Sequence, residues 1–375
     1  MRVLCLNAGS SSLKAAGFVV DEAGGTPERV VSRLVEHVGE PAAPTPLDAL
    51  ATVADAFDDE GFAPVHAVAH RLVHGGPDLL DHCVIDAPVR SRLDAAVPFA
   101  PLHLAAELAV VDSAAVRYPG ATPVACLDTA FHRHLPPAAR RLPIPAALDT
   151  KGIRRYGFHG LSYEHLVQRL GRALGRRAVL AHLGNGASLA AVRDGVGIDT
   201  TMGLTPTGGI VMGTRPGDLD PGVLVHLLRV HGLDAAELEH LVDHRSGLLG
   251  VSRRSGDVRD LLAAADTGDG DAALALELYE VVAAKHVAAL TTVLGGLDTL
   301  VFTAGVGEHA APVRAGIAAR LAHLDVAVDD DANGTHAPVI SPSGASVTVR
   351  VEPTDEESAM ARHAARLAPA GGARL

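Results

Sequence analysis

Positive charge, cysteine and long apolar runs are all scarce in this sequence. The formal net charge is −12, from 44 acidic and 32 basic residues. A protein that binds nucleic acid or an anionic membrane surface would need a basic face. The charge balance therefore excludes both kinds of partner, although it identifies no function by itself.

The cysteines, Cys5, Cys83 and Cys126, are widely separated and form no Cys-x-x-Cys pair. This spacing argues against a disulfide framework or a zinc site, and it predicts that the cysteines are small buried apolar residues. The first residues become polar too soon for a signal peptide, and no stretch reaches the ~18 consecutive apolar residues of a membrane helix. We therefore expect a cytoplasmic protein.

The length of 375 residues, 48% of them hydrophobic, is sufficient for two ordinary domains. Two similar β-hairpins each open one half of the chain. The first has predicted strands at residues 3–6 and 13–20, and the second at residues 178–183 and 188–192. We therefore expect a duplicated α/β domain.

A gapless alignment of the two hairpins places Val3 on Val179 and Ser12 on Ser188. The segments outside the hairpins show helical spacing of apolar residues or short apolar runs. The predicted helices are residues 102–117, 165–174, 272–294 and 355–367, and the predicted strands are residues 124–127 and 300–303.

The turn of the first hairpin reads Asn-Ala-Gly-Ser-Ser-Ser-Leu-Lys over residues 7–14. Its small residues let backbone N–H groups and hydroxyls approach an anion, and Lys14 adds positive charge on the outgoing strand. The spacing is not that of a P-loop. A plain hairpin turn would explain the glycine, but not three serines and a lysine.

Two further glycine pairs follow predicted strands. Residues 182–188 read His-Leu-Gly-Asn-Gly-Ala-Ser, and residues 305–308 read Gly-Val-Gly-Glu. One such pair indicates only a tight turn. Three turns of this kind, each after a strand, predict a nucleotide-binding protein.

Three arginines lie in loops rich in glycine and proline. Arg71 precedes Gly75-Gly76, Arg155 begins a glycine-bounded turn that contains His159, and Arg215 lies between glycines and prolines. Surface arginines are usually only solvated, but rigid loops are where arginines form bidentate contacts with phosphate or carboxylate. These loops therefore indicate anion binding.

Acidic residues that could hold a metal ion accompany these anion-binding motifs. Asp128 follows the predicted strand at residues 124–127, and Glu356 and Glu357 begin a predicted helix. At a helix start, acids also complement the helix dipole. A nucleotide-bound Mg²⁺ keeps several waters and needs only one or two protein carboxylates, so acids from two distant segments are sufficient.

Together these motifs resemble the acetate kinase family, within the sugar kinase, Hsp70 and actin superfamily. The resemblance covers essentially the whole chain, and its most specific stretch is DTTMGLTPTGGIVMGTRPGDLDP, residues 199–221. It implies an α/β fold of two duplicated actin/Hsp70-like (ribonuclease H-like) domains with the active site in the interdomain cleft. The implied N-terminal domain is residues 1–132, completed by a C-terminal helix at 359–375. Residues 133–358 form the implied C-terminal domain, with most of the nucleotide site.

The resemblance also implies roles for individual residues. The implied catalytic residues are Arg71, His103, Asp128, His159 and Arg215. The implied acyl-substrate residues are Arg71, Val73, Leu102, Phe158 and Pro206. The implied metal site consists of Asn7, Asp128 and Glu356. The implied nucleotide-binding residues are Ser10, Ser12, Lys14, His182, Leu183, Gly184, Asn185, Gly186, Asp257, Val258, Arg259, Gly305, Val306, Gly307, Glu308 and His309.

The implied activity is reversible phosphoryl transfer from ATP to acetate, which yields acetyl phosphate and ADP. It requires Mg²⁺, with Mn²⁺ as an alternative metal, and members of the family are typically homodimers through the second domain. A carboxylate is already an anionic nucleophile, so direct in-line transfer needs positioning and cationic cover rather than a general base.

Three alternatives stay open. Propionate or another short-chain acid is a possible acceptor, because one methylene changes discrimination by only ~1–3 kcal/mol, although the branched Val73 narrows the implied pocket. A pyrophosphate-using variant is a second alternative, since Arg253, Gly256 and His309 depart from the family's usual residues. A catalytically silent nucleotide-binding switch is the third, but it would not need two arginines and an acyl pocket.

Overall fold

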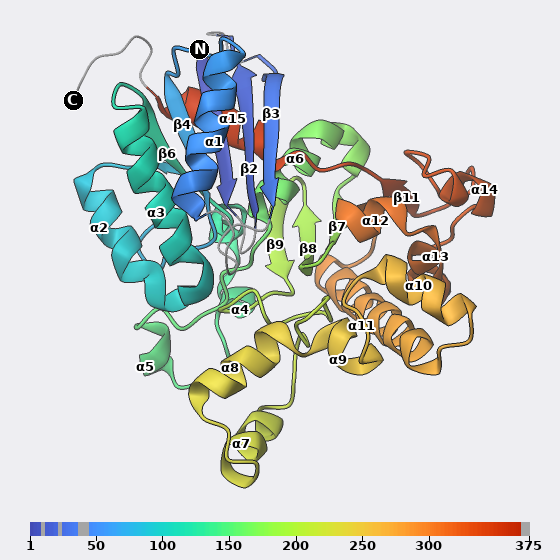
Figure 1. Ribbon diagram of the computed structural model, residues 1–375. Helices are drawn as coiled ribbons and strands as arrows, with labels where there is room; N and C mark the ends of the chain where they lie inside the picture. Colours follow the sequence, from blue (N-terminus) through green and yellow to red (C-terminus); the bar gives the residue numbers. More distant parts are fainter. Residues whose placement is uncertain (9–11, 22–24, 37–44, 369–375) are drawn as a thin grey trace. The chain divides into compact units, whose positions relative to one another are not determined.

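The computed structural model describes residues 1–8, 12–21, 25–36 and 45–368 (Figure 1). The chain forms two compact units. The first comprises Met1–Arg133, Gly160–His165 and Asp355–Leu375, and the second comprises His134–His159 and Leu166–Thr354. None of the helices in the described segments is long and apolar enough to cross a membrane.

The first unit contains a mixed six-stranded sheet in the order β3-β2-β1-β4-β6-β5. The first hairpin pairs antiparallel with β3, whereas β4 and β6 continue the sheet in parallel from β1. Its strands are β1 (Arg2–Ala8), β2 (Ser12–Val19), β3 (Glu28–Glu36), β4 (Ala67–Leu72), β5 (Cys83–Val84) and β6 (Thr122–Leu127).

Helices cover both faces of this sheet (Figure 1). Alternate residues of β1 point to opposite faces, as the two-residue period of a strand requires. Val3 and Cys5 pack with Met360 of α15 (Glu356–Leu367), and Leu4 and Leu6 pack with residues of α1 and α3. The other helical segments of this unit are α1 (Pro46–Asp59), α2 (Ala87–Ala96), η1 (Val97–Phe99), α3 (Pro101–Arg117) and η2 (Ala130–His134).

The second unit contains a mixed five-stranded sheet in the order β11-β10-β7-β8-β9. Its hairpin also pairs antiparallel with the next strand, and its two remaining strands also continue in parallel from the first. The strands are β7 (Arg177–Leu183), β8 (Ala187–Arg193), β9 (Val196–Thr200), β10 (Thr299–Thr303) and β11 (Thr348–Val351). Apart from the short edge strand β5, the two sheets therefore share one topology.

The shared topology agrees with the expected duplication, but the gapless alignment of the hairpins is wrong. Val3 lies opposite Phe18, whereas Val179 lies opposite Ala191. With Val3 kept on Val179, the second strands match only after a shift of three residues. Ser12 is therefore not the counterpart of Ser188, because the second hairpin closes over fewer residues.

The long helix α11 (Gly270–Leu294) packs on β7 and β8, and its buried residues include Leu276, Val287 and Leu290. Gly295, with φ of 72°, ends this helix in the left-handed conformation that a C-terminal glycine adopts without strain. The other helices and helical turns of this unit are α4 (Pro137–Arg140), α5 (Ala146–Asp149), η3 (Gly171–Leu174), α7 (Pro221–Val230), α8 (Ala235–His244), α9 (Gly247–Ser252), α10 (Val258–Asp266), α12 (Ala304–His309), α13 (Ala311–Arg320), η4 (Ala322–Leu324) and α14 (Asp330–Gly334).

Two predicted elements differ from the structure. The helix expected at residues 165–174 is α6 (Gly160–Leu170), which begins five residues earlier and stops at Gly171, where φ is 49°. The glycine pair at residues 305–308 does not form a tight turn, because it lies inside α12. There the Glu308 carboxylate accepts the backbone N–H of Ala304 at 2.9 Å and holds the chain in a helical turn.

Candidate functional site

Arg71 and Asp128 form the centre of a charged cluster in the first unit. β4 and β6 are parallel neighbours in which Leu72 lies opposite Leu127, so Arg71 and Asp128 emerge at the same edge of the sheet. The Arg71 guanidinium donates through Nη2 to Asp128 Oδ2. Burial would lower the pKa of Arg71, but the charges of Asp128 and Glu107 hold it above its usual value. Arg71 is therefore a permanent cation at this edge.

Glu356 and Asn7 extend the cluster at the end of β1 and the start of α15. Asn7 Nδ2 donates to Glu356 Oε2 at 3.3 Å and lies 3.5 Å from Glu357 Oε1. Burial and, after it, repulsion from Asp128 raise the pKa of Glu356 to about 7, although Arg71 opposes the shift. The structure thus gathers all three predicted metal-site residues, Asn7, Asp128 and Glu356, near Arg71.

These residues fit a hard divalent cation. Asp128 is 1% exposed, and its Oδ1 has no hydrogen-bond partner among the described residues. Such a buried carboxylate oxygen requires a cation or water. The mutual repulsion of Asp128 and Glu356 is also what a bound cation would relieve. Two carboxylates and an amide, with waters in the remaining positions, match the oxygen ligands that Mg²⁺ or Mn²⁺ prefers.

The other predicted residues of this unit are only partly described. Lys14 lies opposite Asn7 across the hairpin, is exposed, and lowers the pKa of Glu356 through its charge. His103 lies in the first turn of α3, and Val73, which follows β4, is buried. Ser10 lies outside the described residues, and the side chains of Ser12 and Leu102 are not described.

Sequence reasoning missed Glu107, a buried acid on α3. Its Oε1 lies 3.5 Å from Arg71 Nη1, and its Oε2 accepts the backbone N–H of Val73 at 2.8 Å. A signal was available in the sequence. Glu107 stands three residues after Leu104 and four before Val111, so it occupies the apolar face of a predicted helix.

His159 is the centre of a second group, which lies in the second unit. It has φ of 57°, a left-handed conformation that is uncommon for a residue with a Cβ and that concentrates at functional sites. His159 Nδ1 lies 2.9 Å from Ser188 Oγ on β8, and the rings of His159 and His182 stack with centroids 4.0 Å apart. Ser188, the last residue of the predicted phosphate-binding motif at residues 182–188, thus orients the His159 ring.

Arg215 lies close to His159 and to the glycine turn at residues 184–186. Its Nη1 donates to the carbonyl of Pro206 at 2.6 Å. A Cβ on Gly186 would lie 3.4 Å from His159 Nε2 and 3.5 Å from Arg215 Nη2. Gly186 therefore leaves its backbone open between an imidazole and a guanidinium, a combination suited to an oxyanion.

The turn at residues 184–186 also contacts the segment around Gly213. The Gly213 N–H donates to the Asn185 carbonyl at 3.1 Å, and a Cβ on Gly213 would clash with Asn185 Oδ1 at 2.4 Å. Gly256 approaches Gly213 from the other side, and a Cβ there would lie 2.8 Å from the Gly213 carbonyl. At Gly256 the obstacle is backbone, so a glycine is needed there for this approach to Gly213.

The residues assigned to adenosine binding lie in two separate elements. Asp257 caps α10 and pairs with Arg259 at 2.6 Å, so both side chains are already engaged. In α12, Gly305 and the His309 side chain are exposed, whereas Gly307 is buried. Leu183, Val258 and the acyl-pocket residue Phe158 are core residues, with exposures of 0%, 4% and 1%.

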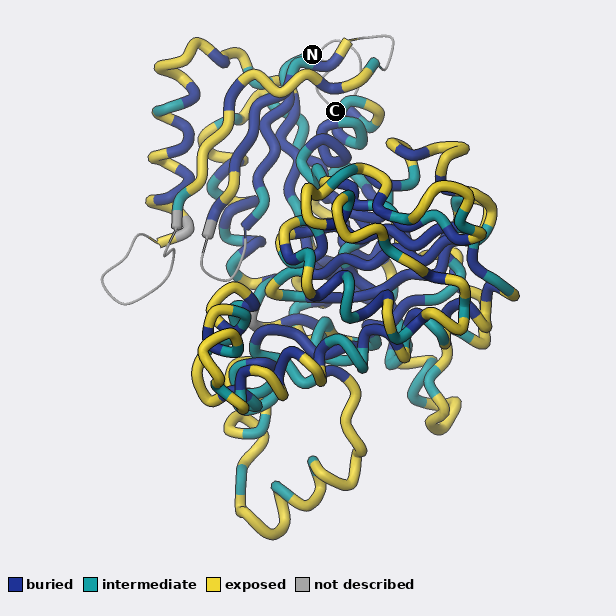
Figure 2. The backbone as a smooth tube through the Cα atoms, turned by 90° about the vertical axis from the view of Figure 1, so that its right-hand side faces the viewer, coloured by how far each residue is buried: buried dark blue, intermediate teal, exposed yellow. Residues whose placement is uncertain are grey.

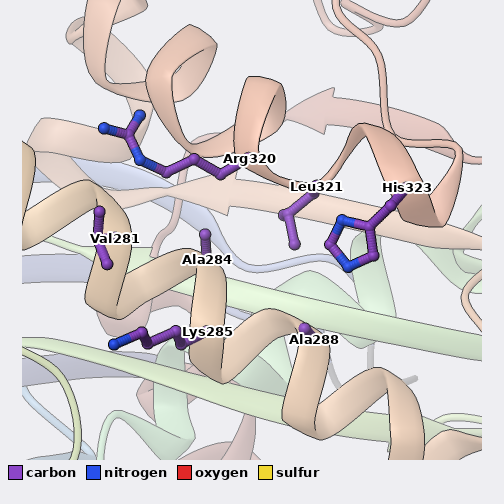
Figure 3. A pocket seen from close by; sticks show the side chains of 7 residues that line it. All are labelled: Val281, Ala284, Lys285, Ala288, Arg320, Leu321 and His323. Atoms are coloured by element: carbon purple, nitrogen blue, oxygen red, sulfur yellow. The ribbon is translucent and has the colours of Figure 1, made fainter.

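A pocket of about 420 Å³ lies elsewhere in the second unit, between α11 and the α13–η4 segment. Figure 3 shows Lys285, Arg320 and His323 among its lining side chains. Arg320 is paired with Glu280 at 2.8 Å, which neutralises its charge. None of the predicted site residues lines this pocket.

His82, Glu164 and His363 bring three potential metal-ligand atoms within 4.8 Å of one another in the first unit. His82 Nδ1 accepts the backbone N–H of Leu127 at 3.0 Å, so the proton of the neutral ring is on Nε2, which donates to Glu164 at 3.2 Å. A metal on Nε2 would require that proton to move to Nδ1, where the Leu127 N–H already points. The cluster therefore joins the loop before β5 to α6 and α15, and it is a poor metal site.

Comparisons with known proteins identify the family to which this chain is similar. A model described as the acetokinase family matches residues 2–362. An acetate kinase of Micrococcus luteus is 40% identical over 340 residues, which cover 88% of this chain and 87% of that protein.

Two solved structures match almost the full length. A propionate kinase from Francisella tularensis subsp. tularensis has a TM-score of 0.91 at 32% identity, and the match covers 98% of this chain and 99% of that one. An acetate kinase from Porphyromonas gingivalis has a TM-score of 0.87 at 34% identity, with the same coverage. These likenesses confirm the predicted α/β fold, which the structure shows to contain two mixed sheets.

Proposed function

Because the chain belongs to the acetokinase family, we propose that it transfers the γ-phosphoryl group of ATP to acetate, reversibly, to give acetyl phosphate and ADP. The observation that carries this proposal is the cluster at the edge of β4 and β6. A half-buried arginine there meets a buried carboxylate that has an unsatisfied oxygen, so one place offers both anion and cation binding.

We propose that the first unit binds the acceptor and the metal. Arg71 holds the acetate carboxylate or the phosphoryl group, and Val73 and Leu102 contribute to the pocket for the methyl group. Asp128 and Glu356 hold Mg²⁺, directly or through water, with Asn7 as support; Mn²⁺ suits the same oxygen donors. When bound, the metal neutralises phosphate charge as the reaction proceeds.

We propose that the second unit binds the nucleotide and the transferring group. The turn at residues 184–186 supports the phosphates, and Asp257–Arg259 and Gly305–His309 contact the nucleoside. Because Leu183 and Val258 are core residues, they contribute through their backbones. His159 and Arg215 stabilise the transferring phosphoryl group, and Phe158 and Pro206 contribute to substrate binding.

The chemistry follows from these assignments. A carboxylate oxygen attacks the γ-phosphorus, the bond from phosphorus to the β–γ bridging oxygen breaks, and ADP leaves with the electron pair. The attacking carboxylate is already ionised, so no residue has to remove a proton. Cationic groups counter the repulsion between two anions and the charge that spreads over the phosphoryl oxygens.

A second candidate for the acceptor acid, propionate, also has support. One similar solved structure is a propionate kinase. We propose acetate as the preferred acid, because Val73 is branched and buried and therefore leaves less room for a longer chain. Propionate is then a slower substrate, since one methylene changes discrimination by only ~1–3 kcal/mol.

We also propose that the predicted domains, residues 1–132 with 359–375 and residues 133–358, correspond to the two compact units. We further propose that two copies of the protein associate through the second unit. None of the described residues of α7 and α8 is buried, and α7 leaves Val223, Val225, Leu228 and Val230 at least 40% exposed (lower part of Figure 2). An apolar helix of this kind is typical of a subunit interface. Sedimentation at increasing protein concentration tests the dimer, and a cytoplasmic location stays a prediction.

The test of the reaction is hydroxylamine trapping with purified protein, ATP and Mg²⁺. Acetate, propionate and butyrate are compared as acceptors, and the acyl hydroxamate is measured for each. We expect the strongest signal with acetate. A stronger signal with a longer acid would overturn the acceptor, and no hydroxamate with any acid, despite ATP binding, would overturn the proposed reaction. Replacing ATP by pyrophosphate in the same assay tests the alternative donor.

A further inference from the structure

Glu107 is a buried acid in the middle of an otherwise apolar part of α3. The surrounding sequence, Leu104 to Val111, is almost entirely aliphatic, and the Glu107 side chain is 2% exposed. An ionisable group in such a place is unfavourable unless specific partners compensate for lost hydration. A leucine or alanine would satisfy the packing, so the carboxylate itself requires an explanation.

The partners of Glu107 are two residues at the end of β4. Its Oε2 accepts the Val73 N–H at 2.8 Å, and its Oε1 lies 3.5 Å from Arg71 Nη1. One carboxylate thus contacts both the cation assigned to the substrate carboxylate and the backbone of the residue assigned to the methyl pocket. These two contacts fix the relation between the charged and apolar ends of the acceptor site.

Glu107 and Asp128 also approach Arg71 through different nitrogens, Nη1 and Nη2 respectively. A planar guanidinium held from two directions has little freedom to rotate. Its Nε has no hydrogen-bond partner among the described residues, so these two acids are the contacts that orient the group. The longer contact, to Glu107, is the one that an incoming anion would displace more readily.

The protonation behaviour of Glu107 is consistent with a site residue. Burial raises its pKa to about 7, while Arg71 and the Val73 N–H oppose the shift. Groups that combine burial with a specific charge partner concentrate at functional sites.

We infer that Glu107 is a positioning residue for binding of the acceptor acid. Its carboxylate holds the Arg71 guanidinium and the Val73 backbone in a fixed relative position. This inference rests on the proposed function of Arg71 and Val73. Loss of the whole side chain should weaken acetate binding and reduce the discrimination between acetate and propionate, and it should leave the KM for ATP nearly unchanged.

The experiment compares Glu107→Ala and Glu107→Gln with the wild type. The alanine variant loses both contacts, whereas glutamine keeps an oxygen for the Val73 N–H and loses only the charge. Asp112→Asn is the matched control, because Asp112 is an exposed acid on the same helix that pairs with Arg90 at 2.8 Å. Circular dichroism establishes that each variant is folded, and glutamine remains informative if alanine does not fold.

For Glu107→Ala we expect the KM for acetate to rise about tenfold, as for a lost charge-assisted hydrogen bond, with the KM for ATP changed less than about twofold. The kcat/KM ratio of acetate to propionate should fall. Glu107→Gln should keep that ratio and show a smaller rise in KM, because Val73 remains held. Equal rises in both KM values, or a lower melting temperature with unchanged acetate KM, would overturn the inference.

A binding measurement separates this inference from the proposed reaction. Line broadening of the acetate methyl NMR signal reports acetate binding without turnover. Weaker binding to Glu107→Ala than to wild type and Asp112→Asn supports the positioning role even if no hydroxamate forms, a result that would overturn the reaction alone. Equal binding to all three proteins would overturn the positioning role.

Discussion

The two units use one sheet topology for opposite electrostatic purposes. In the first, the strand ends carry buried acids around one arginine, and the pKa values of Glu107 and Glu356 are raised to about 7. In the second, the corresponding hairpin carries a glycine turn flanked by stacked histidines and Arg215. The fold itself therefore does not determine which charge is bound; the side chains at the strand ends do.

This difference suits the two partners of the proposed reaction. A cluster with excess acid attracts a metal ion, and its single arginine provides an anion site beside it. A turn without buried acids, in contrast, accepts phosphate through backbone groups and cations. Four predictions test this division: three on activity, from the largest expected effect to the smallest, and one on stability.

Removal of either arginine should have the largest effect. Arg71→Ala and Arg215→Ala should each lower kcat by at least ~10²–10³, because each removes a cation from the charge that develops during transfer. Steady-state rates with acetate and ATP measure the loss, and Arg172→Ala, an exposed residue of η3, is the control. Turnover near the wild-type rate in either folded variant would remove that arginine from the mechanism.

The metal assignment should show as a changed Mg²⁺ requirement. Glu356→Gln should raise the Mg²⁺ concentration needed for half-maximal activity by roughly 10–100-fold, since one of two carboxylates is lost. Ser188→Ala, in the second unit, serves as the comparison and should leave this concentration unchanged. An unaltered Mg²⁺ curve for Glu356→Gln would contradict the assignment.

Ser188→Ala should affect the rate moderately. The serine hydroxyl lies 2.9 Å from His159 Nδ1, and loss of one hydrogen bond typically costs ~0.5–1.5 kcal/mol, which is about a 2- to 12-fold lower kcat. The KM for acetate should not change. A selective rise in the acetate KM would instead place this pair with the acceptor.

The last prediction concerns stability rather than activity. The pKa of Glu107 is about 7 when folded and ~4.3 when unfolded, so the folded state binds its proton more tightly. The free energy of unfolding should therefore fall as the pH rises from ~4.3 to ~7, by at most ~3–4 kcal/mol from this group. Glu107→Gln cannot ionise, and its stability relative to wild type should increase between pH 5 and 8.

Denaturant unfolding at several pH values measures this difference. A constant difference between the two proteins would mean that Glu107 does not titrate in this range. Both proteins share the pH dependence of Glu356, whose pKa is also raised to about 7, so the difference between them isolates Glu107.

The sequence was sufficient to predict the two hairpins, the long helix ending at Gly295 and the expected gathering of Asn7, Asp128 and Glu356. These depend on local patterns or on residues within recognisable motifs. It was not sufficient for the hairpin register, because a turn length cannot be read from matching residues alone. The prediction of a tight turn at Gly305–Glu308 was wrong, because these residues lie in a short helix in which the Glu308 side chain accepts the Ala304 N–H.

Glu107 illustrates a different limit. Its position on an apolar helix face was visible, but its partners come from β4, more than thirty residues earlier in the chain. Only the packing of α3 against that strand gives the acid a role. The partner of His159, Ser188, was similarly visible as a residue but not as a contact.

The most direct test of the central claim follows the oxygen atoms of the acceptor. The reaction is run with ATP, Mg²⁺ and acetate labelled with ¹⁸O in both carboxylate positions, and acetyl phosphate is observed by ³¹P NMR. Attack of the carboxylate on phosphorus predicts that the product signal shows the isotope shift of an ¹⁸O bridge to phosphorus. Acetyl phosphate without that shift, or ADP formed with inorganic phosphate alone, would contradict the account.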